Sequence, residues 1–158
     1  CTLAVERAKD VLQRDVLDLV YLTGAGVSEI HDGLLNHLRS RDDVQAVGVS
    51  CYTTAESHAA ILAGADVIQV PYSRMDRRMA SIFSLATSSG VGVVVRSVLL
   101  QGALSDKVSG CPTAVQQAAD EMRSALVTNW TRLPQLAVRF ASAAPVDSVI
   151  LGPQSVAE

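Results

Sequence analysis

Short apolar runs alternate with helical segments along nearly the whole chain, and this alternation limits the folds available to it. The runs with the length and composition of strands are 16–22, 44–50, 66–70, 90–95 and 148–152. Stretches with apolar residues at helical spacing are 3–14, 29–40, the segment between Thr54 and Gly64, 75–88, 113–128 and about 134–143. The order is αβαβαβαβααβ. Buried strands that are joined through helices predict an α/β protein with a parallel sheet.

Local signals predict where several helices begin and end. Ser28 precedes EIHDGLLNHLRS as an N-cap, and Thr53 or Thr54 caps the next helix together with Glu56. Gly64 is suited to the C-terminal end of that helix, and Pro134 to the first turn of another.

Two architectures remain open from the pattern alone. Right-handed crossovers give either a doubly wound open sheet or a (β/α)₈ barrel. Five strands fit an open sheet and are fewer than a closed barrel needs, since barrels usually take about 250 residues. Gly24 and Gly26 suggest a dinucleotide turn, but that motif needs a glycine where Glu29 stands and an acidic residue where Ser50 stands.

Composition excludes several classes of partner. The chain has 158 residues and a net charge of −3, and we expect one domain over residues 1–158. The cluster Arg74, Arg77 and Arg78 is too small for a nucleic-acid footprint. No apolar run approaches the roughly 18 residues that span a bilayer, and no signal peptide is recognised. We therefore expect neither a nucleic-acid nor a membrane partner.

The cysteines indicate a cytoplasmic protein. Cys1, Cys51 and Cys111 are odd in number and lack CxxC spacing, which argues against a disulfide framework or a zinc site and fits a reducing compartment. Because the first residue is a cysteine and not a methionine, we expect a chain cut from something longer, with a lipid-modified N-terminal cysteine as the alternative.

The predicted strands end in polar residues. Gln69 interrupts an apolar strand and Arg96 directly follows three valines, so both side chains need polar partners. Amides, hydroxyls and one cation gather at these ends without a carboxylate. Such a set suits an amide- or phosphate-bearing ligand better than acid–base chemistry.

Four stretches together carry a family resemblance. They are VQAVGVSCYT (44–53), AGADVIQVPYSRMDRR (63–78), GVGVVVRSVLLQGALSDK (90–107) and LPQLAVRFASAAPVDSVILGPQS (133–155). In this order and spacing the chain resembles an aldo/keto reductase, from the helix before the fourth barrel strand to the start of the last helix. The resemblance implies a partial TIM (β/α)₈ barrel with about five parallel strands and interleaved helices.

The resemblance also implies a cofactor, because aldo/keto reductases reduce aldehydes and ketones with NADPH. Ser50 and Gln69 match the residues that hold the nicotinamide carboxamide, while Cys51 stands where the family usually has asparagine. Arg96 matches the position that stacks on the nicotinamide. The loop that wraps the pyrophosphate corresponds to Ser97, Val98, Leu99, Gln101 and Gly102, with Lys107 adding charge. Gly152 matches the segment beside the adenosine 2′-phosphate.

The family's catalytic residues are not matched in this chain. The family uses a tyrosine, a lysine and an aspartate that come from strands before this chain begins, and a histidine whose position corresponds to Thr23. Tyr21, Tyr52 and Tyr72 do not match that tyrosine, so we assign no catalytic residue and no metal ligand. His31, His37 and His58 fall in predicted helices and are interpreted as surface or packing residues.

Two hypotheses follow for the chain as a whole. It is either a segment of a complete carbonyl-reducing barrel or a truncated, degenerate homologue that acts as a non-catalytic binding or partner module. Five barrel strands leave two open sheet edges, and open edges pair with other chains. Self-association or a partner chain is therefore expected.

Overall fold

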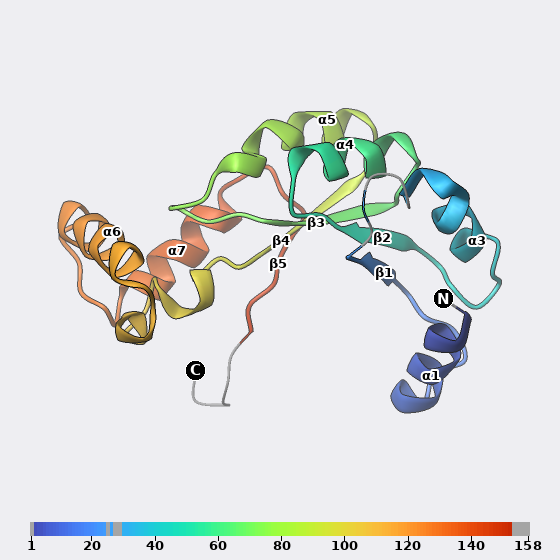
Figure 1. The fold of residues 1–158 in the computed structure, drawn as a ribbon, viewed down its shortest axis with the longest axis horizontal. Coiled ribbons are helices and arrows are strands. Elements are labelled where there is room, and N and C mark those ends of the chain that lie inside the picture. Colours follow the sequence, from blue (N-terminus) through green and yellow to red (C-terminus); the bar gives the residue numbers. More distant parts are fainter. Residues whose placement is uncertain (1, 25, 27–29, 153–158) are drawn as a thin grey trace. The chain divides into compact units, whose positions relative to one another are not determined.

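The computed structural model of this chain describes residues 2–24, 26 and 30–152 (Figure 1). Five parallel strands form one open sheet in the order β1-β2-β3-β4-β5. They are β1 (Val20–Thr23), β2 (Val47–Ser50), β3 (Val67–Pro71), β4 (Gly92–Arg96) and β5 (Ser148–Val149). The strands follow one another in chain order, whereas a doubly wound sheet reverses its order at a switch point. The α/β fold is therefore that of a partial barrel, as the resemblance implied.

Helices separate the strands much as the periodicity predicted. They are α1 (Thr2–Leu12), α3 (Leu35–Arg39), α4 (Thr54–Leu62), α5 (Phe83–Ser88), α6 (Thr113–Ala125) and α7 (Leu133–Ser142). A π-helical turn, Ile30–Leu34, precedes α3, and a 3₁₀ turn, Arg78–Ile82, precedes α5. No helix within the described residues is long and apolar enough to cross a membrane.

The strands predicted over 16–22, 44–50 and 148–152 are all shorter than expected, and the second of them begins at Val47. In place of the predicted strand 16–22, β1 begins only at Val20. Before it, Leu17 forms an isolated bridge to Val44. The predicted strand 148–152 is confined to Ser148–Val149, which pair with Val94 and Val95 of β4. An apolar run marks where a strand can form, but its length is set by how many backbone groups find partners on the neighbouring strand.

The contacts within the chain divide it into two units. The first comprises Cys1–Val70 and Ser81–Val93, and the second comprises Pro71–Ala80 and Val94–Glu158. That residues 1–158 form one domain stays a prediction.

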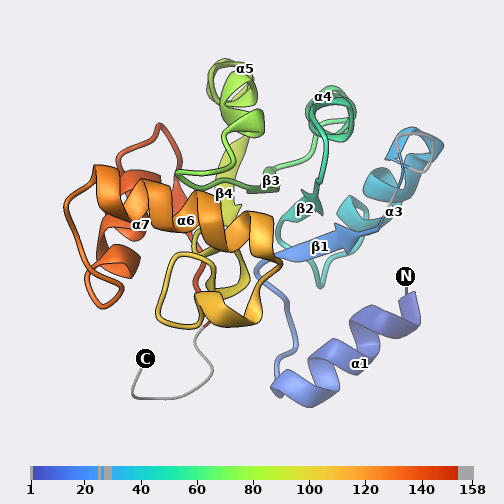
Figure 2. The same cartoon turned by 60° about the vertical axis from the view of Figure 1, so that its left-hand side comes forward.

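The core of the first unit lies between its strands and helices. Figures 1 and 2 show α3, α4 and α5 on one side of β1, β2 and β3. On that side Val47, Val49 and Ile68 are completely buried, together with Leu35 and Leu38 at 1% exposure. Such burial of branched side chains supplies most of the free energy that holds helices onto a parallel sheet.

The cap predictions for α4 are confirmed. The backbone N–H of Glu56 donates to Thr53 Oγ1 at 3.2 Å, and Glu56 Oε2 accepts from the N–H of Thr53 at 3.2 Å. This reciprocal capping box satisfies amides that the first helical turn leaves unpaired. Gly64 follows the helix with φ of +80°, and Pro134 lies in the first turn of α7. The cap expected at Ser28 lies outside the described residues.

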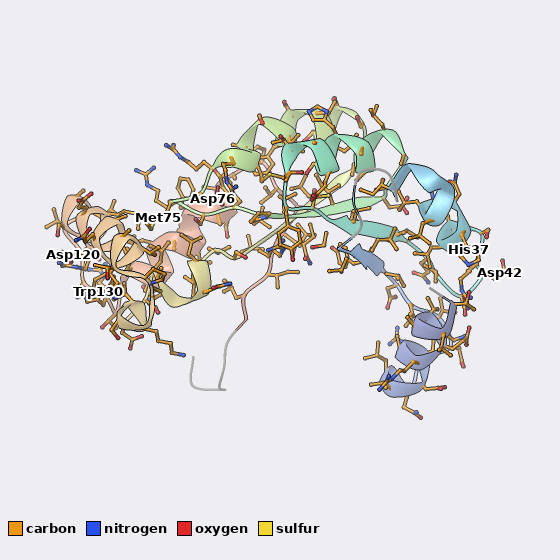
Figure 3. All side chains as sticks on the ribbon, viewed as in Figure 1. His37, Asp42, Met75, Asp76, Asp120 and Trp130 are labelled. Atoms are coloured by element: carbon orange, nitrogen blue, oxygen red, sulfur yellow. The ribbon has the colours of Figure 1, made fainter. Side chains whose placement is uncertain are left out.

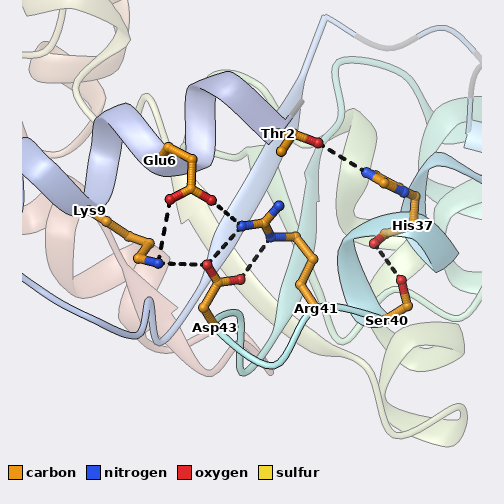
Figure 4. A network of polar contacts seen from close by, with 7 residues as sticks. All are labelled: Thr2, Glu6, Lys9, His37, Ser40, Arg41 and Asp43. Carbon is orange, nitrogen blue, oxygen red and sulfur yellow. Dashed lines mark hydrogen bonds and ion pairs between the residues drawn. The ribbon is translucent and has the colours of Figure 1, made fainter.

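An ion network that the sequence patterns did not predict joins α1 to the turn before β2 (Figure 4). Lys9 Nζ lies 2.8 Å from Asp43 Oδ2, and Arg41 reaches both oxygens of Asp43 at 2.8 and 2.7 Å. Arg41 and Lys9 also pair with Glu6. Hydrogen bonds from Arg41 and then Lys9 hold the pKa of the Asp43 carboxyl well below its usual range.

Candidate functional site at the strand ends

Three polar side chains form a row across the last residues of β1, β2 and their neighbour β3. The parallel register pairs Thr23 with Ser50, and Ser50 with Gln69. Residues paired in this way present their side chains on the same face of a sheet. The neighbouring residues Val49 and Ile68 point to the opposite face, where they are buried under the helices. The row therefore lies on the face of these strands opposite α3, α4 and α5.

Ser50 and Gln69 interact directly within this row. Ser50 Oγ donates to Gln69 Oε1 at 3.3 Å, with Ser50 at 5% exposure and Gln69 half-buried. Among the described residues, the amide nitrogen of Gln69 meets no acceptor. The arrangement thus leaves an N–H donor beside a hydroxyl oxygen, and a carboxamide needs both a donor and an acceptor.

Cys51 is turned away from this pair. Its backbone N–H donates to Gln69 O at 2.8 Å, and its thiol contacts Val49 O at 3.6 Å with no exposed surface. The residue after Ser50 points to the opposite face, because side chains alternate along a strand. The thiol therefore does not belong to the row that Ser50 and Gln69 form.

In the second unit, the segment after β4 has an uncommon backbone. Ser97, Leu100 and Gln101 have φ of +59°, +48° and +55°, and Gly102 has φ of +97°. Residues other than glycine adopt this left-handed region at a cost, and such residues concentrate at ligand-binding segments. Hydrogen bonds from Leu100 N to Ser97 O at 2.9 Å and from Gly102 N to Leu99 O at 3.0 Å fix the turns.

The other residues predicted for this segment lie as follows. Arg96 is half-buried at the end of β4, and its Nη1 donates to Ser97 Oγ at 3.2 Å. Val98 is buried, Leu99 is half-buried, and Gln101 is exposed. A Cβ at Gly102 would lie 3.3 Å from the Cβ of Lys107, whose own side chain is exposed.

The predicted residues are thus brought together in two groups. Ser50 and Gln69 form one group in the first unit, and the segment from Arg96 to Lys107 forms another in the second unit. Gly152 is exposed at the end of the described residues, where an added Cβ would meet nothing within 4 Å.

Thr23 and the histidines, to which no catalytic role was assigned, lie on separate elements. Thr23 is exposed at the end of β1, His58 is exposed on α4, and His37 on α3 lies 3.4 Å from Thr2 Oγ1. The side chain of His31 is outside the described residues. In the part of the chain that the structure describes, no three His, Cys, Asp or Glu side chains gather as metal ligands would.

Tyr21, which the sequence motifs did not assign to the site, lies on the same face as the polar row. It is paired with Gly48 in the register, and the two residues lie two positions before Thr23 and Ser50 on their strands. Its ring is half-buried, and this burial raises the pKa of the phenol. The available signal was Gly48 itself, because glycine inside a strand often marks a close approach.

Comparisons with known proteins agree with the partial-barrel fold. The model of the aldo/keto reductase family matches residues 2–158. The holo form of the aldo-keto reductase AKR11C1 from Bacillus halodurans is similar at 25% identity and a TM-score of 0.83, covering 98% of this chain and 54% of that one. Its apo form gives the same identity and TM-score over 99% of this chain and 58% of that one.

A more distant structure shows the same fold. The thermostable aldo-keto reductase Tm1743, solved with the inhibitor epalrestat, has 18% identity and a TM-score of 0.64, covering 99% of this chain and 56% of that one. The chain spans little more than half the length of these structures. No curated protein matches the chain.

Proposed function

Because the chain belongs to the aldo/keto reductase family, we propose that the complete barrel reduces aldehydes or ketones with NADPH. This chain supplies most of the cofactor site and none of the catalytic residues. The observation that carries the proposal is the pairing of Ser50 with Gln69 at 3.3 Å, at the ends of adjacent strands.

The residues present fit a nicotinamide dinucleotide. Ser50 and Gln69 together offer a hydroxyl and an amide N–H to the nicotinamide carboxamide. The half-buried guanidinium of Arg96 is planar and suited to stacking against an aromatic ring. When bound, NADPH supplies the hydride that reduces the carbonyl carbon.

The segment after β4 suits the phosphate groups. In this proposal the backbone N–H groups of Ser97, Val98, Leu99 and Gln101 donate to the pyrophosphate. Gly102 permits a close approach of backbone to ligand, and Lys107 adds a positive charge. Gly152 lies beside the adenosine 2′-phosphate.

Fluorescence titration of the complete protein with NADPH tests the cofactor assignment. Gln69→Ala and Arg96→Ala are each expected to weaken binding about tenfold, since each removes roughly one net interaction. Gln45→Ala and Arg77→Ala are matched controls, because both side chains are exposed outside the proposed site. If neither Gln69→Ala nor Arg96→Ala changes the affinity, the cofactor assignment is wrong.

A non-catalytic binding or partner module is the second candidate. It is favoured by Thr23, since a short hydroxyl stands where the family places the histidine that orients the carbonyl. The residues that precede Cys1 in the complete protein distinguish the two. An aspartate, a tyrosine and a lysine at successive strand ends would support the enzyme, and their absence would support the module.

The edge of β1 supports the proposal of association with a second copy or a partner chain. In the described part of the chain β1 pairs on one side only, with β2. A cleft of about 300 Å³ lies beside it, lined by Val5, Leu12, Leu17 and Leu38 among others. Leu12 is 62% exposed in this arrangement, and an edge with apolar surface beside it favours strand pairing.

A further inference from the structure

A second pocket, unrelated to the cofactor residues, lies between α6 and α7 in the second unit. Its volume is about 280 Å³. Its apolar wall consists of Met122, Leu126, Leu133, Leu136 and Ala137. Pockets that take small molecules measure about 300–1,000 Å³, so this one lies just below that range. It suits a short hydrocarbon chain and is too small for a peptide helix.

Two arginines complete the lining of this pocket. Arg139 lies on α7, and Arg74 follows β3; both side chains are exposed. The Arg74 guanidinium lies 5.3 Å from the ring centroid of Phe140, which also lines the pocket. Phe140 in turn stacks on Tyr72, with centroids 5.5 Å apart and planes inclined by 19°. The cation–π contact therefore holds Arg74 at the pocket wall.

The charges of these two arginines are not compensated within the described residues. Neither Arg74 nor Arg139 forms an ion pair with a carboxylate there. Other arginines of the same region do: Arg78 pairs with Asp76 at 2.7 Å. Arg123 likewise pairs with Asp120 at 2.6 Å and lies over the ring of Trp130. Asp76, Asp120 and Trp130 are labelled in Figure 3.

We propose that this pocket binds a medium-chain carboxylate, such as decanoate. The hydrocarbon chain lies against the apolar walls of α6 and α7, and the carboxylate lies on Arg74 and Arg139. Burial of methylene groups supplies affinity, and charge-assisted hydrogen bonds from guanidinium groups select an anionic head. A neutral or cationic amphiphile would leave the two guanidinium groups without their counter-charge.

Calorimetric titration of the complete protein with decanoate tests the proposal. We expect saturable binding at one site, and octanoate, which has two fewer methylenes, should bind about tenfold more weakly. Decyltrimethylammonium has the same hydrocarbon chain with a cationic head and should not bind. The heat of binding is read without NADPH or a carbonyl substrate, so this test is independent of the reductase proposal.

Variants locate the site. Arg74→Gln and Arg139→Gln should each weaken decanoate binding about tenfold, since each loses one charge-assisted contact. Arg77→Gln is the matched control, because Arg77 is exposed but does not line the pocket. Ala137→Leu, which fills the pocket, should abolish binding, and circular dichroism checks that each variant is folded.

The proposal is overturned by any of three results. Decanoate and decyltrimethylammonium could bind equally, which would indicate a nonspecific apolar surface. Arg77→Gln could weaken binding as much as Arg74→Gln, which would indicate general charge attraction. The unsubstituted protein could fail to bind decanoate at all.

Discussion

The ring of Tyr21 occupies the space that a side chain at Gly48 would need. A Cβ at residue 48 would lie 2.5 Å from Tyr21 Cε1, 2.6 Å from Cδ1 and 3.1 Å from the carbonyl oxygen of Val67. Contacts this short force the ring or the strand to move. The packing of Tyr21 therefore favours glycine at residue 48.

Gly48→Ala should lower the free energy of unfolding by about 1–3 kcal/mol, the usual cost of overpacking. Gly110→Ala is the matched control, because a Cβ there meets nothing within 4 Å and the residue has no left-handed φ. Urea unfolding of both variants measures the difference. Equal stabilities of the two variants would show that Tyr21 moves aside without cost.

Stability should depend on pH through Asp43. Its pKa is lowered in the folded state, so the carboxylate contributes stability above the ordinary aspartate pKa of about 3.9. That contribution is lost as the pH falls through the folded-state pKa. Asp43→Asn should therefore be less stable at neutral pH and lose less of its stability between about pH 5 and pH 2.

Thermal unfolding followed at several pH values measures this effect. Asp42→Asn is the control, since Asp42 is exposed beside Asp43 and forms no ion pair among the described residues. Parallel stability curves for the unsubstituted protein and Asp43→Asn would contradict the assignment.

Thr53→Ala should cost about 1 kcal/mol of unfolding free energy, because it removes the N-cap acceptor of α4. Thr53→Ser keeps a hydroxyl and should restore most of the loss. Thr54→Ala is the control one residue later, inside the helix. A loss at Thr54 as large as at Thr53 would mean that α4 begins at a different residue.

Gly102→Ala should weaken NADPH binding because residue 102 has φ of +97° and packs against Lys107. An alanine in this region costs about 1–2 kcal/mol, so the segment after β4 should change conformation. NADPH titration is the measurement, with Gly110→Ala as the control of unchanged affinity. If Gly102→Ala kept its affinity for NADPH, the segment after β4 would not be part of the cofactor site.

Association through the edge of β1 is tested by light scattering across micromolar concentrations. Leu12→Lys places a charge in the cleft beside β1 and should shift the protein toward the monomer. Leu62→Lys is the matched control, because Leu62 is 78% exposed on α4 and does not line this cleft. A stable monomer before any substitution would refute the association itself.

The sequence predicted the features that depend on neighbouring residues. The helices, the capping box of Thr53 with Glu56 and the glycine at residue 64 are determined by signals within a few positions. The barrel was reached through the family resemblance, since the periodicity left an open sheet equally possible. The consecutive strand order resolves that choice.

Features that depend on distant residues were not predictable in the same way. Lys9 and Asp43 are 34 positions apart, so no local pattern connects them. The left-handed φ of Leu100 and Gln101 has no signature either, because neither residue type favours that conformation. In the candidate site, the residue types of Ser50 and Gln69 indicated a polar ligand. That the two side chains are neighbours follows only from the register of β2 and β3, which the sequence does not show.

The carboxylate of Glu56 accepts from the backbone N–H groups of both Tyr52 and Thr53, at 2.6 and 3.2 Å. It thereby ties the start of α4 to the segment that leaves Ser50, using the backbone of residue 52 and not its exposed side chain. Since the contact uses the backbone N–H of residue 52, it persists when the side chain there is exchanged, except for proline, which lacks that N–H. Thr53 and Glu56, by contrast, act through their side chains, so the loss of either polar group removes at least one hydrogen bond of the capping box.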